Sequence, residues 1–166
     1  MADENLDLAW GYQLEDYINI GTAVAPKWLK VTELLSWDVS SENTEYTPTW
    51  IDRQNQPTFI MGASCSITFE KDTVIGGELE KWIMENRNNT DVSCDICRVY
   101  TWDGEDNAKT ADKATFLFTP SVLSKSNAGQ PVVTGGILNR VSDGWTEGTW
   151  NTSEKTFSEV AASEQQ

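Results

Sequence analysis

The side chains with the clearest potential for chemistry are the three cysteines, Cys65, Cys94 and Cys97. Cys94 and Cys97 form a Cys-x-x-Cys motif, which can hold zinc or act as a redox dithiol. Zinc needs a second pair of ligands, and the chain has neither another such motif nor any histidine. A redox dithiol precedes a helix, whereas this motif lies in an apolar stretch typical of a strand. Since residues three apart in a strand point to opposite faces, we interpret the cysteines as buried thiols of a protein kept in a reducing compartment.

Other catalytic groups find equally little support. The lack of histidine excludes Ser-His-Asp and Cys-His nucleophiles. The acidic stretch from Asp103 to Asn107 lacks the ligand spacing of a calcium loop. Gly76-Gly77 could cradle an anion, but Glu78 and Glu80 would repel phosphate. We therefore predict no catalytic residue, no metal and no cofactor. An acidic-site hydrolase stays as a remote alternative, because carboxylate pairs are frequent in so acidic a chain.

Tryptophan is unusually frequent, with eight in the chain. Four fall on periodic apolar faces and are predicted to lie in the core: Trp28, Trp37, Trp82 and Trp102. The other four fall in arms and loops, where a tryptophan either stacks on sugar or is buried by a protein partner. With their apolar neighbours they give the candidate subunit-interface residues Trp10, Tyr12, Tyr46, Trp50, Ile51, Trp145 and Trp150.

The elements that must position these residues are mostly strands. From Phe59 to Phe69 every odd residue is apolar, which predicts a strand with one buried face. Helical spacing of apolar residues follows, so a helix is predicted over about residues 74–88. The other predicted strands begin at Trp28, Val92, Ala114 and Pro131, the last with Gly135-Gly136 as a bulge or sharp bend.

Three segments lie outside this periodic pattern. Residues 1–26 are either an extended arm that docks on a partner or an N-terminal strand completing its own sheet. Residues 40–56 form a long polar connection, which either grips a neighbour or folds back as a lid. Residues 142–166 form the C-terminal segment. The predicted organisation is one domain over residues 1–166, with a β core at residues 27–141.

Charge limits the possible partners. The 166 residues include 12 Lys and Arg against 26 Asp and Glu, which gives a net charge of -14. Such a chain is poorly suited to hold nucleic acid, because phosphate binding needs clustered cations. Neither a signal peptide nor a membrane span is expected.

The order of these features resembles the major tail tube proteins of long-tailed bacteriophages, over residues 17–150. The resemblance rests on an early strand, a following acidic loop, a strand that leads into the helix, and a Gly- and Trp-rich close. In order these are Pro26–Val31, Glu45-Tyr46 with Trp50-Ile51-Asp52, Ser64–Glu70, Leu79–Trp82 and Asp143–Trp150.

The resemblance implies a mainly β fold: a β-sandwich or partly open barrel with one flanking α-helix, a long inter-strand loop and extended terminal arms. It implies a structural virion protein and not an enzyme, six copies of which form a ring. Stacked rings would build the tail tube, with contacts from residues 1–26, 40–56 and 142–166. The implied location is the virion tail, after assembly in the host cytoplasm.

The implied partners are further copies of the chain and the tape measure, tail tip and tail terminator proteins. DNA would pass through the tube without specific binding. We infer an acidic lumen, because a negative wall repels phosphate groups. Two alternatives stay open: a carbohydrate-binding β-sandwich, suggested by the loop tryptophans, and another virion β-domain such as a head decoration protein.

Overall fold

Alternating apolar and polar residues dominate the chain, and strands dominate the structure. A computed structural model describes residues 7–160, and one α-helix is present in that range. The strands pair antiparallel in a sheet that is not closed into a barrel, which confirms the predicted mainly β fold with one helix. The chain divides into two compact units, one from residues 1–32, 94–115 and 142–166 and the other from residues 33–93 and 116–141.

The first unit contains five strands and part of a sixth. In sheet order they are β2 (Trp28–Lys30), β1 (Leu14–Asn19), β5 (Val92–Glu105), the first part of β6 (Ala108–Ser124), β8 (Thr146–Asn151) and β9 (Thr156–Glu159). A short 3-10 helix, η1 (Gly11–Gln13), precedes β1. Because β1 pairs with both β2 and β5, residues 14–19 complete their own sheet and are not part of an extended arm.

Strand β5 is buried on both faces. Cys94 and Ile96 lie on one side and Cys97 and Val99 on the other, and all four are buried. Burial on both faces explains why odd and even residues of this strand are apolar alike, in place of the alternation expected for a half-buried strand. Around β5 the core includes Tyr17, Trp28 and Trp150, whose rings meet at centroid distances of 4.4 Å for Tyr17 and 5.7 Å for Trp28 from Trp150.

A carboxylate is buried beside this core. Asp16 on β1 is 6% exposed and accepts a 3.1 Å hydrogen bond from Nε of Arg98 on β5. Burial raises the pKa of Asp16 to about 6, although the adjacent Arg98 cation acts to lower it. Asp16 is thus a carboxyl group whose ionisation opposes folding near neutral pH.

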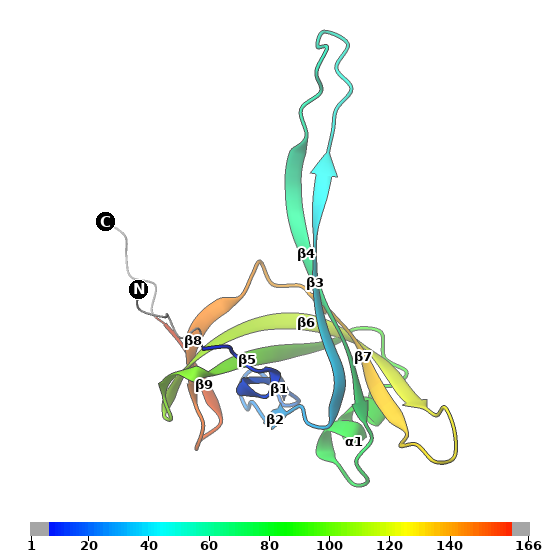
Figure 1. Cartoon of the computed structure of the whole chain (residues 1–166), viewed down its shortest axis with the longest axis vertical. Coiled ribbons are helices and arrows are strands. Elements are labelled where there is room, and N and C mark those ends of the chain that lie inside the picture. Colours follow the sequence, from blue (N-terminus) through cyan, green and yellow to red (C-terminus); the bar gives the residue numbers. More distant parts are fainter. Residues whose placement is uncertain (1–6, 161–166) are drawn as a thin grey trace. The chain divides into compact units, whose positions relative to one another are not determined.

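The second unit is a four-stranded sheet with a helix on one face (Figure 1). Its strand order is the second part of β6, then β7 (Val133–Arg140), β4 (Phe59–Asp72) and β3 (Leu34–Tyr46). Helix α1 (Glu78–Glu85) buries Leu79 and Ile83 against the sheet. Rings run across this inner face in contact, Trp37 with Phe69, Phe69 with Phe118 and Phe118 with Trp82, at centroid distances of 5.3, 5.9 and 5.4 Å.

The helix is shorter than the predicted span of about 74–88. Gly76 has φ +80, which is outside the helical region, and the turn before α1 is closed by a 3.2 Å bond from Gly77 N–H to Val74 carbonyl. A buried ion pair then fixes the helix to β4: Lys71, 1% exposed, donates to Glu80. Burial acts to raise the pKa of Glu80, but hydrogen bonds from Lys71 and from Val74 N–H lower it below its usual value.

Gly135 and Gly136 do not form the predicted bulge or bend. Both lie in regular register within β7, with Gly136 opposite Phe69 on β4 and Pro120 on β6. The reason for glycine is close approach: a Cβ on Gly136 would lie 2.4 Å from a ring carbon of Phe118. The bulge is instead in β6, where the register shifts between Ser121 and Ser124.

Strands β3 and β4 are longer than predicted. Residues 40–46, assigned to a loop from sequence, belong to β3, so the connection is shortened to residues 47–58. The odd residues Phe59, Met61 and Ala63 of β4 are exposed, contrary to the predicted buried face. The reason is that β7 pairs with β4 only from Ser66 to Asp72, and beyond that point β3 is the one strand of the described chain that pairs with it.

We predict that Gly136→Ala lowers the free energy of unfolding by about 1–3 kcal/mol, because the Phe118 ring is held between Phe69 and Trp82 and cannot yield. Gly62→Ala is the matched control. Gly62 lies in β4, and a Cβ added there would have no heavy atom within 4 Å, so its change should stay within about 0.5 kcal/mol. Urea denaturation measures both, and equal effects would contradict the close approach at Gly136.

We also predict that wild-type stability falls relative to Asp16→Asn as pH rises from about 4 to 7. The pKa of Asp16 is about 6 in the fold against an ordinary 3.8, so the folded state holds this proton more tightly than the unfolded state. The difference corresponds to about 3 kcal/mol. Denaturation at a series of pH values tests this, with the exposed Asp106→Asn as control. An Asp16→Asn difference that is constant with pH would contradict the prediction.

Candidate assembly interface

The cysteines carry no reactive chemistry. All three are free and buried, as predicted. Burial raises the pKa of both Cys94 and Cys97 to about 12, so neither is a thiolate at neutral pH. Within residues 7–160 no group of three or more Cys, Asp or Glu side chains could hold a metal ion. No helix in that range is long and apolar enough to cross a membrane.

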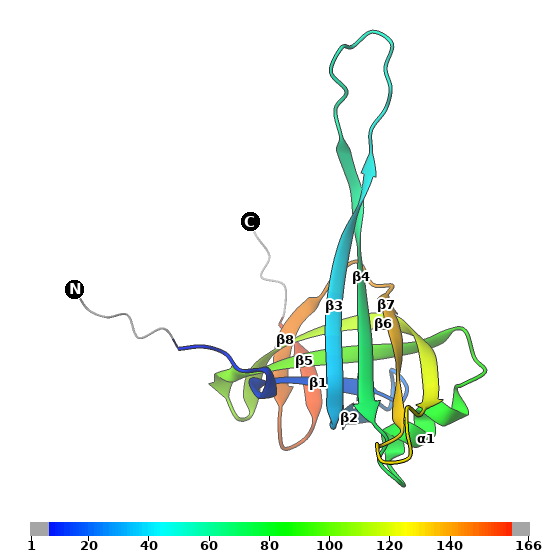
Figure 2. The same cartoon turned by 45° about the vertical axis from the view of Figure 1, so that its right-hand side comes forward.

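The most unusual feature is a projecting ribbon, formed by the parts of β3 and β4 beyond the pair Ser41–Cys65 and by the loop that joins them (residues 42–64). Figures 1 and 2 show it extending past the other strands of its own unit. Apart from Pro48, every residue of the ribbon is exposed or only partly buried. A two-stranded hairpin with no covering layer is only marginally stable in water. In the described chain no third strand or helix covers the ribbon, so a binding partner would stabilise it.

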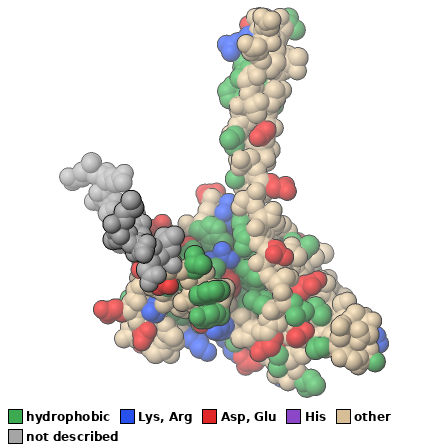
Figure 3. All heavy atoms as spheres, viewed as in Figure 1, with side chains coloured by type: hydrophobic (Ala, Val, Ile, Leu, Met, Phe, Trp, Pro, Cys, Tyr) green, Lys and Arg blue, Asp and Glu red, His purple; other side chains and the backbone are tan. Residues whose placement is uncertain are grey.

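Apolar side chains are dense along this ribbon. The exposed ones are Tyr46, Trp50, Ile51, Phe59, Ile60 and Met61. Figure 3 shows hydrophobic side chains along its length, with acidic ones interspersed. An exposed apolar surface of this kind marks a binding surface.

Side-chain contacts within the turn hold the end of the ribbon. We name residues 50–56 the knob. The Gln56 side chain accepts a 2.9 Å bond from Trp50 N–H and donates bonds of 3.0 Å to the carbonyls of Trp50 and Arg53. The Arg53 guanidinium lies 4.8 Å from the Trp50 ring centroid, and Phe59 contacts the same ring at 6.1 Å. Ile51 is fully exposed at the turn that these contacts fix.

A second exposed apolar segment lies in the first unit, before β1. Leu8, Trp10 and Tyr12 are all exposed, and η1 is held by a 2.8 Å bond from Trp10 N–H to the Gln13 side chain. Residues 1–6 of the predicted arm, with Leu6, and residues 161–166 of the C-terminal segment lie outside the described residues.

Of the seven candidate interface residues, five are exposed: Trp10, Tyr12, Tyr46, Trp50 and Ile51. Trp145 is partly buried, with Arg98 5.7 Å from its ring centroid. Trp150 is a wrong candidate, because it is fully buried in the core of its own unit. Trp102, predicted to be core, is half exposed.

Sequence reasoning missed the apolar residues at the other end of the second unit. Thr73, Ile75, Leu123, Lys125, Gln130, Pro131 and Val132 line a groove of about 650 Å³, which we name the base groove. Ile75 is fully exposed there, although helical spacing had placed it on the buried face of the helix. The Gly76-Gly77 pair that follows Ile75 was the signal that the helix begins later.

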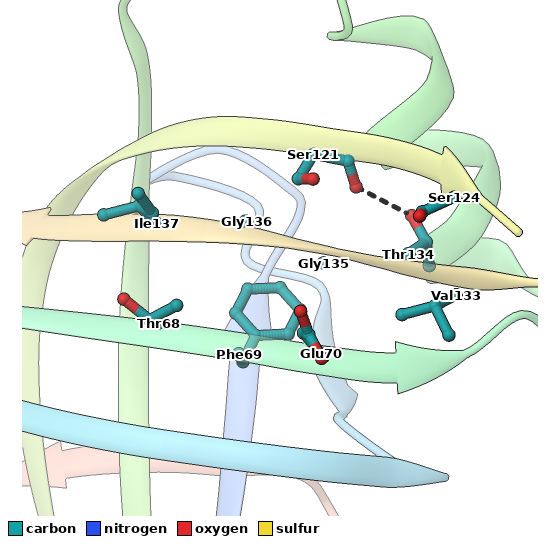
Figure 4. A pocket seen from close by; sticks show the side chains of 10 residues that line it. All are labelled: Thr68, Phe69, Glu70, Ser121, Ser124, Val133, Thr134, Gly135, Gly136 and Ile137. Carbon is teal, nitrogen blue, oxygen red and sulfur yellow. Dashed lines mark hydrogen bonds between the residues drawn. The ribbon is translucent and has the colours of Figure 1, made fainter. Parts of the chain in front are cut away.

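The sheet face opposite α1 in the second unit is polar. We name it the acidic face; its charged residues on β3 and β4 include Asp38, Glu42 and Glu70, and its other members include Ser66, Thr68 and Asn139, with the exposed Ile137 beside Thr68. No Lys or Arg lies on this face in β3, β4, β7 or residues 116–124 of β6. A shallow groove of about 330 Å³ lies over Gly135 and Gly136, where Thr134 Oγ1 donates to the Ser121 carbonyl at 3.3 Å (Figure 4).

This arrangement of a β3–β4 hairpin, one helix and an open antiparallel sheet has known counterparts. A chain of the SPP1 tail tube has a TM-score of 0.65, 10% sequence identity and coverage of 95% of this chain and 94% of that chain. The chain has a phage tail tube-like fold. A chain of the anti-feeding prophage (AFP) baseplate gives a TM-score of 0.54, 9% identity and coverage of 86% and 96%. No protein-family model matches the sequence, and neither does any curated protein.

Proposed function

We propose that this protein is a structural subunit of a phage tail tube, which self-associates into stacked rings through which DNA passes. The tail tube-like fold supports the proposal, and the observation that carries it is the uncovered β3–β4 ribbon. By resemblance the ring has six copies. The AFP chain belongs to a baseplate, so a place in the baseplate is a second candidate within the same class of protein.

Strand β3 supplies a first reason for self-association. Among residues 7–160 it is the last strand of its sheet and pairs only with β4, and it has 13 residues. Its free edge exposes backbone N–H and C=O groups along its length, and it contains neither lysine nor proline to block pairing. A neighbouring copy that adds a strand at this edge would satisfy these groups and extend the sheet from one subunit to the next.

The exposed apolar segments supply a second reason. The ribbon and residues 8–12 carry large apolar side chains that a monomer leaves in water. Burial of such surface is the main favourable contribution to protein association. Both segments correspond to regions that the resemblance assigns to contacts between subunits and between rings.

The acidic face is suited to a channel for DNA. Its charges are all negative, and its remaining residues are mainly small and polar. A wall of this composition repels phosphate groups and offers no cation at which DNA would be held. We therefore assign the acidic face to the lumen of the tube.

The proposed partners beyond further copies are the tape measure, tail tip and tail terminator proteins, and the proposed location is the virion tail after assembly in the host cytoplasm. The protein would act by packing and not by catalysis. The carbohydrate-binding alternative loses one of its candidate residues, because Trp150 is buried in the core of its own unit.

The central experiment replaces residues 42–64 by an Asn-Gly turn that joins Ser41 to Cys65, a directly opposed pair. Because the ribbon buries little, the free energy of unfolding should change by no more than about 1 kcal/mol.

Assembly of the shortened protein should be lost, since the ribbon supplies the contact surface. Negative-stain microscopy should show hollow tubes for the wild type and none for the variant, and the exposed Val24→Ser variant should assemble normally. Tubes from the shortened protein would contradict the role of the ribbon, and a wild type that stays monomeric would contradict the proposed function.

The lumen assignment is tested with Asp38→Lys and Glu70→Lys combined, in tubes assembled in the presence of DNA. At low salt these tubes should protect roughly tenfold more DNA from nuclease than wild-type tubes, because the reversed charges bind phosphate. The control combines Glu105→Lys and Glu154→Lys, which are exposed residues of the other unit. Protection by the control and not by the first variant would show that the acidic face is not in the lumen.

A further inference from the structure

The knob and the base groove lie at opposite ends of one strand. Phe59, the first residue of β4, contacts Trp50 of the knob, and Asp72, its last residue, directly precedes Thr73 of the groove. Fourteen residues of strand separate them, which corresponds to about 45 Å. The knob therefore cannot reach the groove of its own chain. Figures 1 and 2 show the hairpin end and the α1 end of this unit pointing in opposite directions.

The base groove is built by an unusual backbone conformation. Leu123 has φ +46, a left-handed conformation that a leucine adopts only under strain. It lies in the bulge of β6 between Ser121 and Ser124, and half of its side chain is exposed at the groove. Strain that presents an apolar side chain to solvent points to a function for that side chain.

One lining residue of the groove also has an unsatisfied polar atom. Thr73 Oγ1 is buried and has no hydrogen-bond partner in the described part of the chain. The backbone around it is firmly held, because Thr73 N–H donates to the Val132 carbonyl at 2.8 Å. A wall residue of the groove thus carries a buried hydroxyl that the described chain leaves without a partner.

We propose that the knob of one copy of this chain docks in the base groove of a second copy. This inference rests on the proposed function, since it names the partner of the ribbon. The knob brings the exposed Ile51 to a groove lined by Ile75, Leu123 and Val132. In the docked pair Asp52, next to Ile51, would lie at a groove whose only charged lining residue is Lys125.

The knob is suited to this role because contacts within it hold its conformation without a partner. The Gln56 bonds and the Arg53–Trp50 contact fix its backbone, so little conformational entropy is lost on docking. Since the two surfaces differ and lie at opposite ends of the unit, the contact is head-to-tail. Each docked copy leaves one free knob and one free groove, and so the assembly grows in one direction.

The test uses the full chain and measures the pelletable fraction and the tubes seen by negative stain. Ile51→Asp and Leu123→Asn should each lower the pelletable fraction at least tenfold. Both variants should keep the melting temperature of the wild type, because Ile51 touches little and asparagine tolerates the left-handed conformation of residue 123. Val24→Asp, at an equally exposed position of the other unit, is the matched control and should assemble as the wild type does.

Charge reversal identifies the pairing. Asp52→Lys and Lys125→Asp should each weaken assembly, and the double variant should recover it, because the two charges are then exchanged across the contact. Normal tubes from Ile51→Asp and Leu123→Asn, or a double variant no better than either single one, would overturn the docking while the proposed function stands. A wild type that forms no assembly would overturn both.

Discussion

An uncovered pair of strands is the constraint on which the rest of the second unit depends. A β-sheet is stable when its backbone groups are paired and at least one of its faces is buried. Near α1 one face of the sheet is buried, with Phe69 and Phe118 under Trp82 and with Lys71 bound to Glu80. Past Ser41 and Cys65 the two strands still pair with each other, but neither of their faces is buried. The unit is thus a stable sheet from which an incomplete one extends.

The two ends of β4 illustrate how one strand can serve two purposes. Its second half carries the buried residues Ile67, Phe69 and Lys71 that hold the unit together. Its first half carries exposed apolar residues and ends at a knob held by the Gln56 side chain. Substitutions in the two parts are therefore expected to separate stability from assembly, because residues 59–64 of β4 are all exposed.

Much of the fold could be predicted from the order of residues, but not how far each element extends. Alternation in residues 59–69 correctly predicted a strand, and it also predicted a buried face that exists only from Cys65 onward. A local apolar pattern indicates which side chains could be buried. It does not indicate whether another part of the chain covers them. Trp150 was misassigned for the opposite reason: its Gly- and Thr-rich surroundings suggest a loop, yet pairing of β8 with β6 places it in the core.

The exposed Trp10, Trp50 and Ile51 were found because they lie among polar residues. The base groove was not predicted. It depends on a bulge in β6 that places Leu123 in the same groove as Val132, and this bulge has no sequence signature.

Burial of the cysteines has a consequence for the resistance of the protein to oxidation outside a cell. Cys65, Cys94 and Cys97 are buried, and burial raises the pKa of the Cys94 and Cys97 thiols far above neutral pH. Disulfide formation and oxidation by peroxide both start from an accessible thiolate. Under the proposed function, a particle made of this protein could leave a reducing cytoplasm for aerated water without forming stray cross-links between its subunits, so its durability would not depend on any reductant.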